Sequence, residues 1–195
     1  MRSVCIIPAR GASQRIKRKN IRLFFGRPII AYSIDIARQS RLFDEIIVST
    51  EDAEISEVAQ SCGASVLVRP AAMAQDEVGT QAVMQGAMRH VHCDMACCIY
   101  ATAPMLDLAT LWNGRAALLS RTHVYAMSVG TEPLRDAGAM YWGLRSAFLE
   151  GVPLIAPHTA MVPMPEYRVC DINCEDDWQQ AMMMYASLNG LEATA

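Results

Sequence analysis

Long hydrophobic runs are missing from this chain of 195 residues, although 52% of its residues are hydrophobic. The first apolar run, residues 4–7, ends at Pro8 and is too short for a signal peptide or a membrane-spanning helix. The chain is long enough for one domain with a core on both sides of a sheet. We therefore expect a soluble, cytoplasmic protein without a membrane partner.

Acidic residues are nearly absent from the first 41 positions, where Asp35 is the only one. Ten of the 17 Lys and Arg residues lie in the same stretch, whereas the net charge of the whole chain is −3. This local concentration of positive charge favours a compact anion as the partner. A long nucleic acid more often requires basic residues spread over a whole face, so we expect no nucleic acid partner.

Paired cysteine motifs are also missing. The seven cysteines are an odd number, and several stand inside apolar runs such as MACCIYA, residues 95–101. This pattern fits reduced thiols packed in a cytosolic protein. A metal site built from His90, His92 and Cys93, with Cys170 or Cys174, is the alternative interpretation. The chain has no Cys-x-x-Cys or His-x-x-x-His pair that would preorganise such ligands.

Short β-branched runs alternate with longer segments of helical period. This order predicts an α/β fold, in which a single domain holds a Rossmann-like, mostly parallel sheet flanked by helices. The expected strands are residues 4–7, 45–49, 65–68, 95–100, 123–129 and 137–144. The expected helices are one beginning at Pro28, residues 53–61, 80–90 and 108–120, and a closing helix from near Glu175.

The remaining segments of the chain are expected to be irregular. Residues 156–172 contain several prolines and are expected to form an extended chain. We expect the folded domain to span residues 1–189 and residues 190–195 to form a flexible tail.

A basic loop is expected after the first strand, in the sequence IIPARGASQRIKRKN of residues 6–20. Open parallel sheets bind ligands outside the carboxyl ends of their strands, where this loop would lie. Gly11, Ala12 and Ser13 are small enough for backbone N–H groups to face an anion, and Arg10 would add charge-assisted hydrogen bonds. Neither a Walker A loop nor a Gly-x-Gly-x-x-Gly fingerprint is present. We interpret the loop as a polyphosphate cradle, and a solvated basic turn is the alternative.

Several sequence blocks, taken in order, resemble the cytidylyltransferases that activate nonulosonic acids, which are nine-carbon acidic sugars, as CMP esters. The blocks are IIPARGASQRIKRKNI, GRPIIAYSI, LFDEIIVSTEDAEISEVA, VRPAAMAQD, CCIYATAP, DAGAMYWG and YRVCDINCEDDW. The last three are most similar to the branch that acts on pseudaminic acid. The resemblance implies a nucleotide-diphospho-sugar transferase type of fold, CMP transfer from CTP with release of pyrophosphate, and a homodimer. Legionaminic or sialic acid as the sugar, or a nucleotide-binding relative without turnover, are the alternatives.

The resemblance also implies roles for individual residues. The catalytic residues would be Arg10, Lys19 and Asp171. The nucleotide would be bound by Ala9, Gly11, Ser13, Arg69, Asp76, Thr80, Tyr100 and Thr102, and the sugar by Arg135, Asp136 and Tyr141. Two residues have plainer interpretations, because Arg69 before Pro70 also fits a surface turn and Tyr141 also fits a core aromatic.

The family holds Mg²⁺ on an Asp-x-Asp pair, and Asp171 and Asn173 occupy the matching positions in this chain. Mg²⁺ takes oxygen ligands and bridges phosphate oxygens, so a carboxylate beside a triphosphate suits it. The neutral amide of Asn173 removes one unit of charge and predicts weaker Mg²⁺ binding. The acids at residues 175–177 are explained better by the start of a helix than by metal binding.

The chain departs from the family pattern in two further places. Ala12, Gln14 and Lys17 stand where the family loop has Gly, Lys and Pro, so that a phosphate-binding Lys is missing and Lys17 is its candidate substitute. Between Val129 and Arg135 the chain is shorter than its relatives. Their extra segment contributes to the sugar pocket and, in the sialic acid branch, to dimer contacts, so its absence bears on sugar specificity and on the homodimer.

Overall fold

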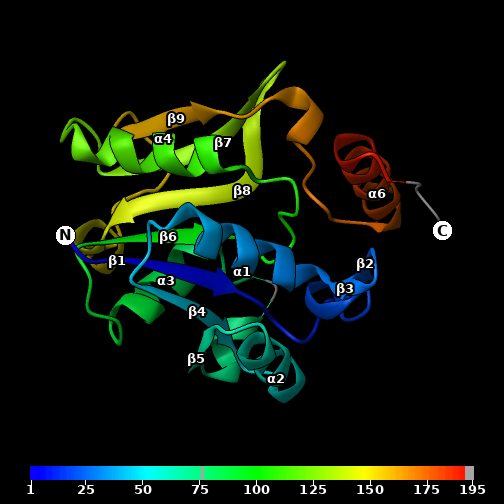
Figure 1. Ribbon diagram of the computed structural model, residues 1–195. Coiled ribbons are helices and arrows are strands. Elements are labelled where there is room, and N and C mark those ends of the chain that lie inside the picture. The colour runs from blue at the N-terminus through cyan, green and yellow to red at the C-terminus, as the bar shows by residue number, and fades with distance from the viewer. Residues whose placement is uncertain (76, 192–195) are drawn as a thin grey trace.

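A seven-stranded sheet forms the centre of the molecule (Figure 1). The computed structural model describes residues 1–75 and 77–191. The strands lie in the order β5-β4-β1-β6-β8-β7-β9, and β8 alone runs antiparallel to its neighbours. Their bounds are β1 Ser3–Pro8, β4 Glu45–Thr50, β5 Ser65–Val68, β6 Met95–Ile99, β7 Tyr125–Thr131, β8 Leu134–Leu144 and β9 Thr159–Pro163. The predicted α/β class with a mostly parallel sheet is confirmed.

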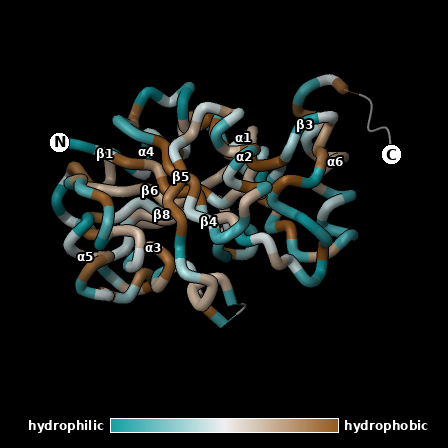
Figure 2. The backbone as a smooth tube through the Cα atoms, turned by 90° about the horizontal axis from the view of Figure 1, so that it is seen from below, coloured by the Kyte–Doolittle hydropathy of each residue, from teal (hydrophilic) through white to brown (hydrophobic). Residues whose placement is uncertain are grey.

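Helices cover both faces of the sheet. On one face lie α1 (Ile29–Ser40), α2 (Ala53–Ser61) and α4 (Leu108–Leu119), and on the other lie α3 (Thr80–Met88) and α5 (Arg145–Glu150). Each face has its own cluster of buried apolar residues. Ile30, Ile34 and Ala37 share the buried side of α1, as their spacing predicts. In Figure 2, hydrophobic segments gather around β5 and β6 in the middle of the molecule, and many of the outer loops are hydrophilic.

A third, smaller cluster stands at the end of the sheet toward which β1 points (Figure 1). It packs α6 (Glu175–Asn189) against a hairpin of β2 (Leu23–Phe24) and β3 (Arg27–Pro28). Ile16 from the basic loop and Ile172 from the segment before α6 are both fully buried in this cluster. The cluster therefore holds the loop after β1 beside a segment from the far end of the chain.

The predicted elements in the first 120 residues agree with the structure within two residues at each end. Residues 53–61 and 65–68 coincide with α2 and β5. The later part differs, because residues 159–163 were expected only as extended chain and form the strand β9 at the edge of the sheet. Prolines are tolerated in an edge strand, where an N–H need not pair. Helix α5 was not predicted.

Every helix among the described residues is too short or too polar to span a membrane.

Candidate active site

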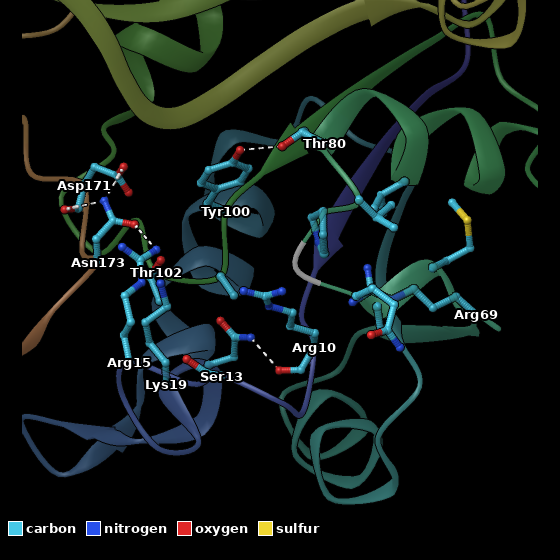
Figure 3. Close-up of a pocket in the computed structure, with 18 residues that line it drawn as sticks. Arg10, Ser13, Arg15, Lys19, Arg69, Thr80, Tyr100, Thr102, Asp171 and Asn173 are labelled. Carbon is cyan, nitrogen blue, oxygen red and sulfur yellow. Dashed lines mark hydrogen bonds between the residues drawn. The ribbon is translucent and has the colours of Figure 1, made fainter. Parts of the chain in front are cut away.

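A cavity of about 310 Å³ lies at the carboxyl ends of β1 and β6, the edge at which parallel sheets bind ligands. It is lined by the loop after β1, the segment between β5 and α3, the residues after β6 and the segment before α6. In Figure 3, Asp171 and Asn173 lie on one side, Arg69 lies on the other, and Arg10 lies between them. The predicted site residues that line the cavity are Arg10, Ser13, Lys19, Arg69, Thr80, Tyr100, Thr102, Asp171 and Asn173.

Some predicted site residues are not among those that line the cavity. Ala9 is buried behind the cavity, and its N–H donates to the carbonyl of Ser49 at 3.0 Å. Arg135 is an exposed residue that forms an ion pair with Glu166 at 2.8 Å, so the structure does not bring it to the cavity. Asp76 lies outside the described residues.

The cations of the basic loop are divided between the cavity and the surface. Arg10, Arg15 and Lys19 line the cavity, whereas Lys17 is exposed and is not among the lining residues. Arg18 turns away to the start of α2, where its guanidinium donates to both Asp52 carboxylate oxygens at 2.6 and 2.9 Å. The structure therefore does not bring Lys17 to the cavity, and Arg15 is the third loop cation that lines it.

Lys19 is the most enclosed cation of this group. Its Nζ donates to the carbonyl of Ile172 at 2.7 Å, which ties the loop to the segment before α6. Burial lowers the pKa of Lys19, the carboxylate of Asp171 opposes this shift, and the like charges of Arg15 and Arg10 lower the pKa further. An anion bound among these three cations would relieve their mutual repulsion, so the arrangement favours a polyphosphate.

Gly11 is not among the residues that line the cavity. Its N–H, which was expected to face a bound anion, donates instead to the Glu51 carboxylate at 2.7 Å. A Cβ atom at this position would lie only 2.2 Å from Oδ2 of Asp52. Glycine is needed here because the loop passes directly against the residue that caps α2.

The ion pair between Arg18 and Asp52 predicts an acid-dependent contribution to stability. The hydrogen bonds from Arg18 are the main cause that lowers the pKa of Asp52 from 3.8 to about 2. A carboxylate whose pKa is depressed in the folded state stabilises the protein above its unfolded pKa, and this contribution is lost as the pH falls through the folded pKa.

We therefore expect the Arg18→Met variant to be less stable than wild type at pH 6. The difference in free energy of unfolding should shrink as the pH falls from about 4 to about 2. Urea denaturation across this pH range measures it. Arg2→Met, which removes an exposed pair with Glu45, is the control and should change stability little. A deficit in Arg18→Met that stays constant down to pH 2 would contradict the assignment.

Asp171 and Asn173 form a connected pair on the wall opposite Arg69 (Figure 3). The Asn173 side-chain amide donates to Asp171 Oδ2 at 2.7 Å, and its oxygen accepts a hydrogen bond from Arg15 at 3.0 Å. These contacts place one carboxylate and one neutral oxygen beside the three loop cations. The predicted juxtaposition of Arg10 and Asp171 is confirmed, because both side chains line the same cavity.

The acids that follow belong to the helix start, as predicted. Asp177 accepts hydrogen bonds from the N–H groups of Asn173 and Cys174 at 2.7 and 2.8 Å. Cys174 accepts in return from the Asp177 N–H, which completes a capping box on α6. Nη1 of Arg22 donates to both carboxylate oxygens of Glu175 at 2.7 Å. None of the acids at residues 175–177 is among the residues that line the cavity.

A chain of hydroxyl groups runs from the cavity into the sheet. Thr80 is hydrogen-bonded to Tyr100 (Figure 3), the ring centroids of Tyr100 and Tyr141 lie 5.4 Å apart, and the Tyr141 hydroxyl donates to Asp136 Oδ2 at 2.6 Å. Burial raises the pKa of both tyrosines, so both remain protonated. Tyr141 is the donor to Asp136 because a carboxylate only accepts, whereas either hydroxyl can donate between Thr80 and Tyr100. Tyr141 is thus a buried core residue whose hydroxyl still connects to the cavity.

Sequence reasoning missed three residues of this region. Arg15 was not distinguished from its neighbours, because the direction of each side chain depends on the left-handed backbone of Arg18 at φ 55°. Asn20 is buried, and its side-chain amide donates to the carbonyl of Arg10 at 2.9 Å. Glu51 binds both Gly11 and Arg69. An acid directly after a strand that ends at the site is the signal that points to Glu51.

The connection between β7 and β8 is very short. Only Glu132 and Pro133 separate the two strands, which form an antiparallel hairpin. Gly138 on β8 has a φ of +60°, and a Cβ there would lie 3.0 to 3.2 Å from the Asp171 side chain. The hairpin therefore brings the backbone of β8 directly against Asp171.

Comparisons with known proteins identify the family. The cytidylyltransferase family model matches residues 4–141. A pseudaminic acid cytidylyltransferase of Campylobacter jejuni is 34% identical over 224 positions, covering 95% of this chain and 97% of the relative. That alignment is longer than the chain of 195 residues, so the relative has at least 29 residues that this chain lacks. The predicted shortness of the chain is confirmed.

Solved structures agree in fold. A CMP-2-keto-3-deoxy-manno-octonic acid synthetase in complex with CTP has a TM-score of 0.78 and 15% identity, covering 98% of this chain and 100% of that one. A Mycobacterium tuberculosis protein in complex with manganese has a TM-score of 0.66 and 16% identity, covering 93% and 98%. The fold is that of the nucleotidyltransferases. This chain belongs to the cytidylyltransferase family.

Proposed function

We propose that this protein transfers CMP from CTP to pseudaminic acid and releases pyrophosphate. The observation that carries the proposal is the convergence of Arg10, Arg15 and Lys19 with Asp171 on one cavity. Three cations on one loop complement the charge of a triphosphate. The choice of pseudaminic acid is supported by the 34% identical relative that bears this name. Legionaminic acid and sialic acid are the alternative sugars.

The proposed reaction is a direct displacement at phosphorus. The anomeric hydroxyl oxygen of the sugar acid bonds to the α-phosphorus of CTP, the bond from that phosphorus to the bridging oxygen breaks, and pyrophosphate leaves. The hydroxyl proton passes to solvent. Arg10, Arg15 and Lys19 would hold the triphosphate and offset the negative charge that grows on the leaving group. The reaction requires no covalent intermediate on the protein.

We propose Mg²⁺ as the cofactor, held by the Asp171 carboxylate and the Asn173 amide oxygen. This donor set fits Mg²⁺, which takes one or two carboxylates and fills its remaining positions with phosphate oxygens and water. No group of three or more His, Cys, Asp or Glu side chains suited to a metal occurs within residues 1–75 and 77–191. Bound Mg²⁺ would neutralise phosphate charge and lower the pKa of the attacking hydroxyl. Arg15 also uses the Asn173 oxygen, so Arg15 and the ion would compete for it.

We assign different parts of the cavity to the two substrates. We assign the nucleotide to Ser13, Arg69, Thr80, Tyr100 and Thr102, and we retain Asp76 there as a prediction. We assign the sugar acid to the side of Asp171, toward Asp136 and Tyr141, which are hydrogen-bonded to each other. The short β7–β8 hairpin leaves this side without the segment that relatives carry in the sugar pocket.

We further propose that the protein acts in the cytoplasm. All seven cysteines are free thiols, which fits a reducing compartment. The resemblance implies a homodimer, whose mass light scattering after size exclusion measures. The local concentration of basic charge and the lack of long apolar runs predict no nucleic acid or membrane partner.

Release of pyrophosphate tests the proposed function directly. CTP is incubated with pseudaminic, legionaminic or sialic acid in turn, with Mg²⁺ or with EDTA. We expect the fastest release with pseudaminic acid and none in EDTA. Faster release with legionaminic or sialic acid would mean that this sugar, and not pseudaminic acid, is the substrate. CTP binding without release for any sugar would favour a nucleotide-binding relative that has lost turnover.

A further inference from the structure

Glu51 lies behind the cavity, directly after β4, and joins two of the segments that line it. Its Oε1 accepts the N–H of Gly11 at 2.7 Å, and its Oε2 accepts Nε–H of Arg69 at 3.2 Å. Gly11 belongs to the basic loop, whereas Arg69 follows β5 and lies on the side of the cavity opposite Asp171 and Asn173. Both carboxylate oxygens are therefore engaged by groups from the two walls.

The pair formed by Glu51 and Arg69 is enclosed. The Arg69 side chain is 8% exposed and the Glu51 side chain 18%, which excludes the surface turn as an interpretation of Arg69. The Arg69 backbone is also fixed, because its N–H donates to the carbonyl of Thr50 at 3.0 Å. Because hydrogen bonds hold both the backbone and the side chain of Arg69, its guanidinium has little freedom to leave the cavity wall.

Charge gives Glu51 a second effect. Burial lowers the pKa of Arg69, Glu51 opposes that shift, and the nearby positive charge of Arg10 adds to it. Arg10 and Arg69 thus carry like charges beside one cavity, and the negative charge of Glu51 offsets part of their repulsion. Without Glu51, this repulsion would be stronger until an anion bound in the cavity.

We infer that Glu51 is a positioning residue that fixes Arg69 and the Gly11 backbone in place before CTP binds. The inference rests on the proposed function, because it concerns the CTP site. Glu51 does not line the cavity, so it acts through the two groups that it holds. Groups that are fixed before binding avoid the cost of ordering them during binding.

The direction in which CTP affinity changes when Glu51 is replaced distinguishes positioning from simple charge repulsion. Glu51 is a negative charge close to a site for a polyanion, so removing that charge alone would strengthen CTP binding. Loss of positioning would weaken it. In the Glu51→Gln variant the side chain keeps its size and one acceptor oxygen but loses the charge and the second acceptor. The two explanations therefore predict opposite changes in affinity.

Calorimetric titration with CTP and Mg²⁺, together with steady-state kinetics, tests the inference. We expect Glu51→Gln to weaken CTP binding about tenfold or more, as the loss of a hydrogen bond to a charged group implies. The KM for CTP should rise by the same factor, with kcat within threefold and the KM for the sugar acid within twofold. The matched control is Glu57→Gln, which removes one charge from an exposed position on α2 and should leave CTP affinity within twofold of wild type.

Two further variants complete the test. In an Arg69→Ala background, Glu51→Gln should weaken CTP binding by a smaller factor than in wild type, because one of the two held groups is gone. If Glu51→Gln does not fold, Glu51→Asp decides instead, since its shorter carboxylate cannot reach both donors and should weaken CTP binding at least threefold.

Unchanged or tighter CTP binding in the deciding variant would overturn the role of Glu51 and leave the proposed function intact. Absence of CTP binding to the wild-type protein would overturn both.

Discussion

Replacing Arg10 by alanine is expected to reduce turnover by well over tenfold, which corresponds to more than about 1.4 kcal/mol in the activation barrier. Arg10 stands in the middle of the cavity, between the wall of Asp171 and the wall of Arg69 (Figure 3). A hydrogen bond between a guanidinium and a phosphate contributes about 1.5 to 3 kcal/mol, and part of it strengthens as charge grows on the leaving group. Pyrophosphate release with saturating sugar acid gives kcat and the KM for CTP.

The basic loop offers a matched control for this experiment. Lys17→Ala removes a positive charge from the same loop, but Lys17 is exposed and lies outside the cavity lining. We expect this variant to retain turnover within about twofold, since exposed charges are screened by solvent and salt. If Lys17→Ala lost as much activity as Arg10→Ala, general attraction of anions would explain the loop, and the specific role of Arg10 would be wrong.

Replacing Asp171 by asparagine is expected to lower turnover at least tenfold, or about 1.4 kcal/mol or more. This variant keeps the shape of the side chain and removes the one carboxylate that lines the cavity within the described residues. The remaining pair of neutral amides would hold a divalent ion poorly. Raising the Mg²⁺ concentration should restore part of the activity. Wild-type activity at low Mg²⁺ would contradict the assignment of Asp171 as the metal ligand.

The reverse change at the neighbouring position gives the complementary result. Asn173→Asp adds a second carboxylate, so the Mg²⁺ concentration for half-maximal activity should fall below that of wild type. In EDTA the variant should melt at a lower temperature, because the amide that now donates to Asp171 at 2.7 Å becomes a second negative charge. Mg²⁺ should reverse this loss. Unchanged metal dependence and unchanged melting would place the ion elsewhere.

The first half of the fold was predictable because local signals agree with the tertiary structure there. The strands β1, β4, β5 and β6 are short β-branched or apolar runs, and α2 begins after Asp52, whose side chain accepts from the N–H of Ile55. The second half depends on the sheet. β9 contains Pro163 and follows a proline-rich stretch, so only its pairing with β7 makes it a strand.

The candidate site was predictable to the level of segments but not to the level of side chains. The position of the basic loop follows from the end of β1, and its meeting with Asp171 was expected only by resemblance. Which cations face the cavity depends on contacts between distant residues, such as Arg18 with Asp52 and Lys19 with Ile172. The hydroxyl chain from Thr80 to Asp136 depends on the antiparallel pairing of β6 with β8. Such contacts leave no periodic signal in one sequence.

Calorimetric titration of the wild-type protein with CTP tests the central claim, that the basic loop and Asp171 together hold a nucleoside triphosphate. We predict one binding site per chain, with an affinity that rises when Mg²⁺ replaces EDTA and falls as the salt concentration increases. Absence of heat on adding CTP with Mg²⁺, or an affinity that neither Mg²⁺ nor Arg10→Ala changes, would contradict the account.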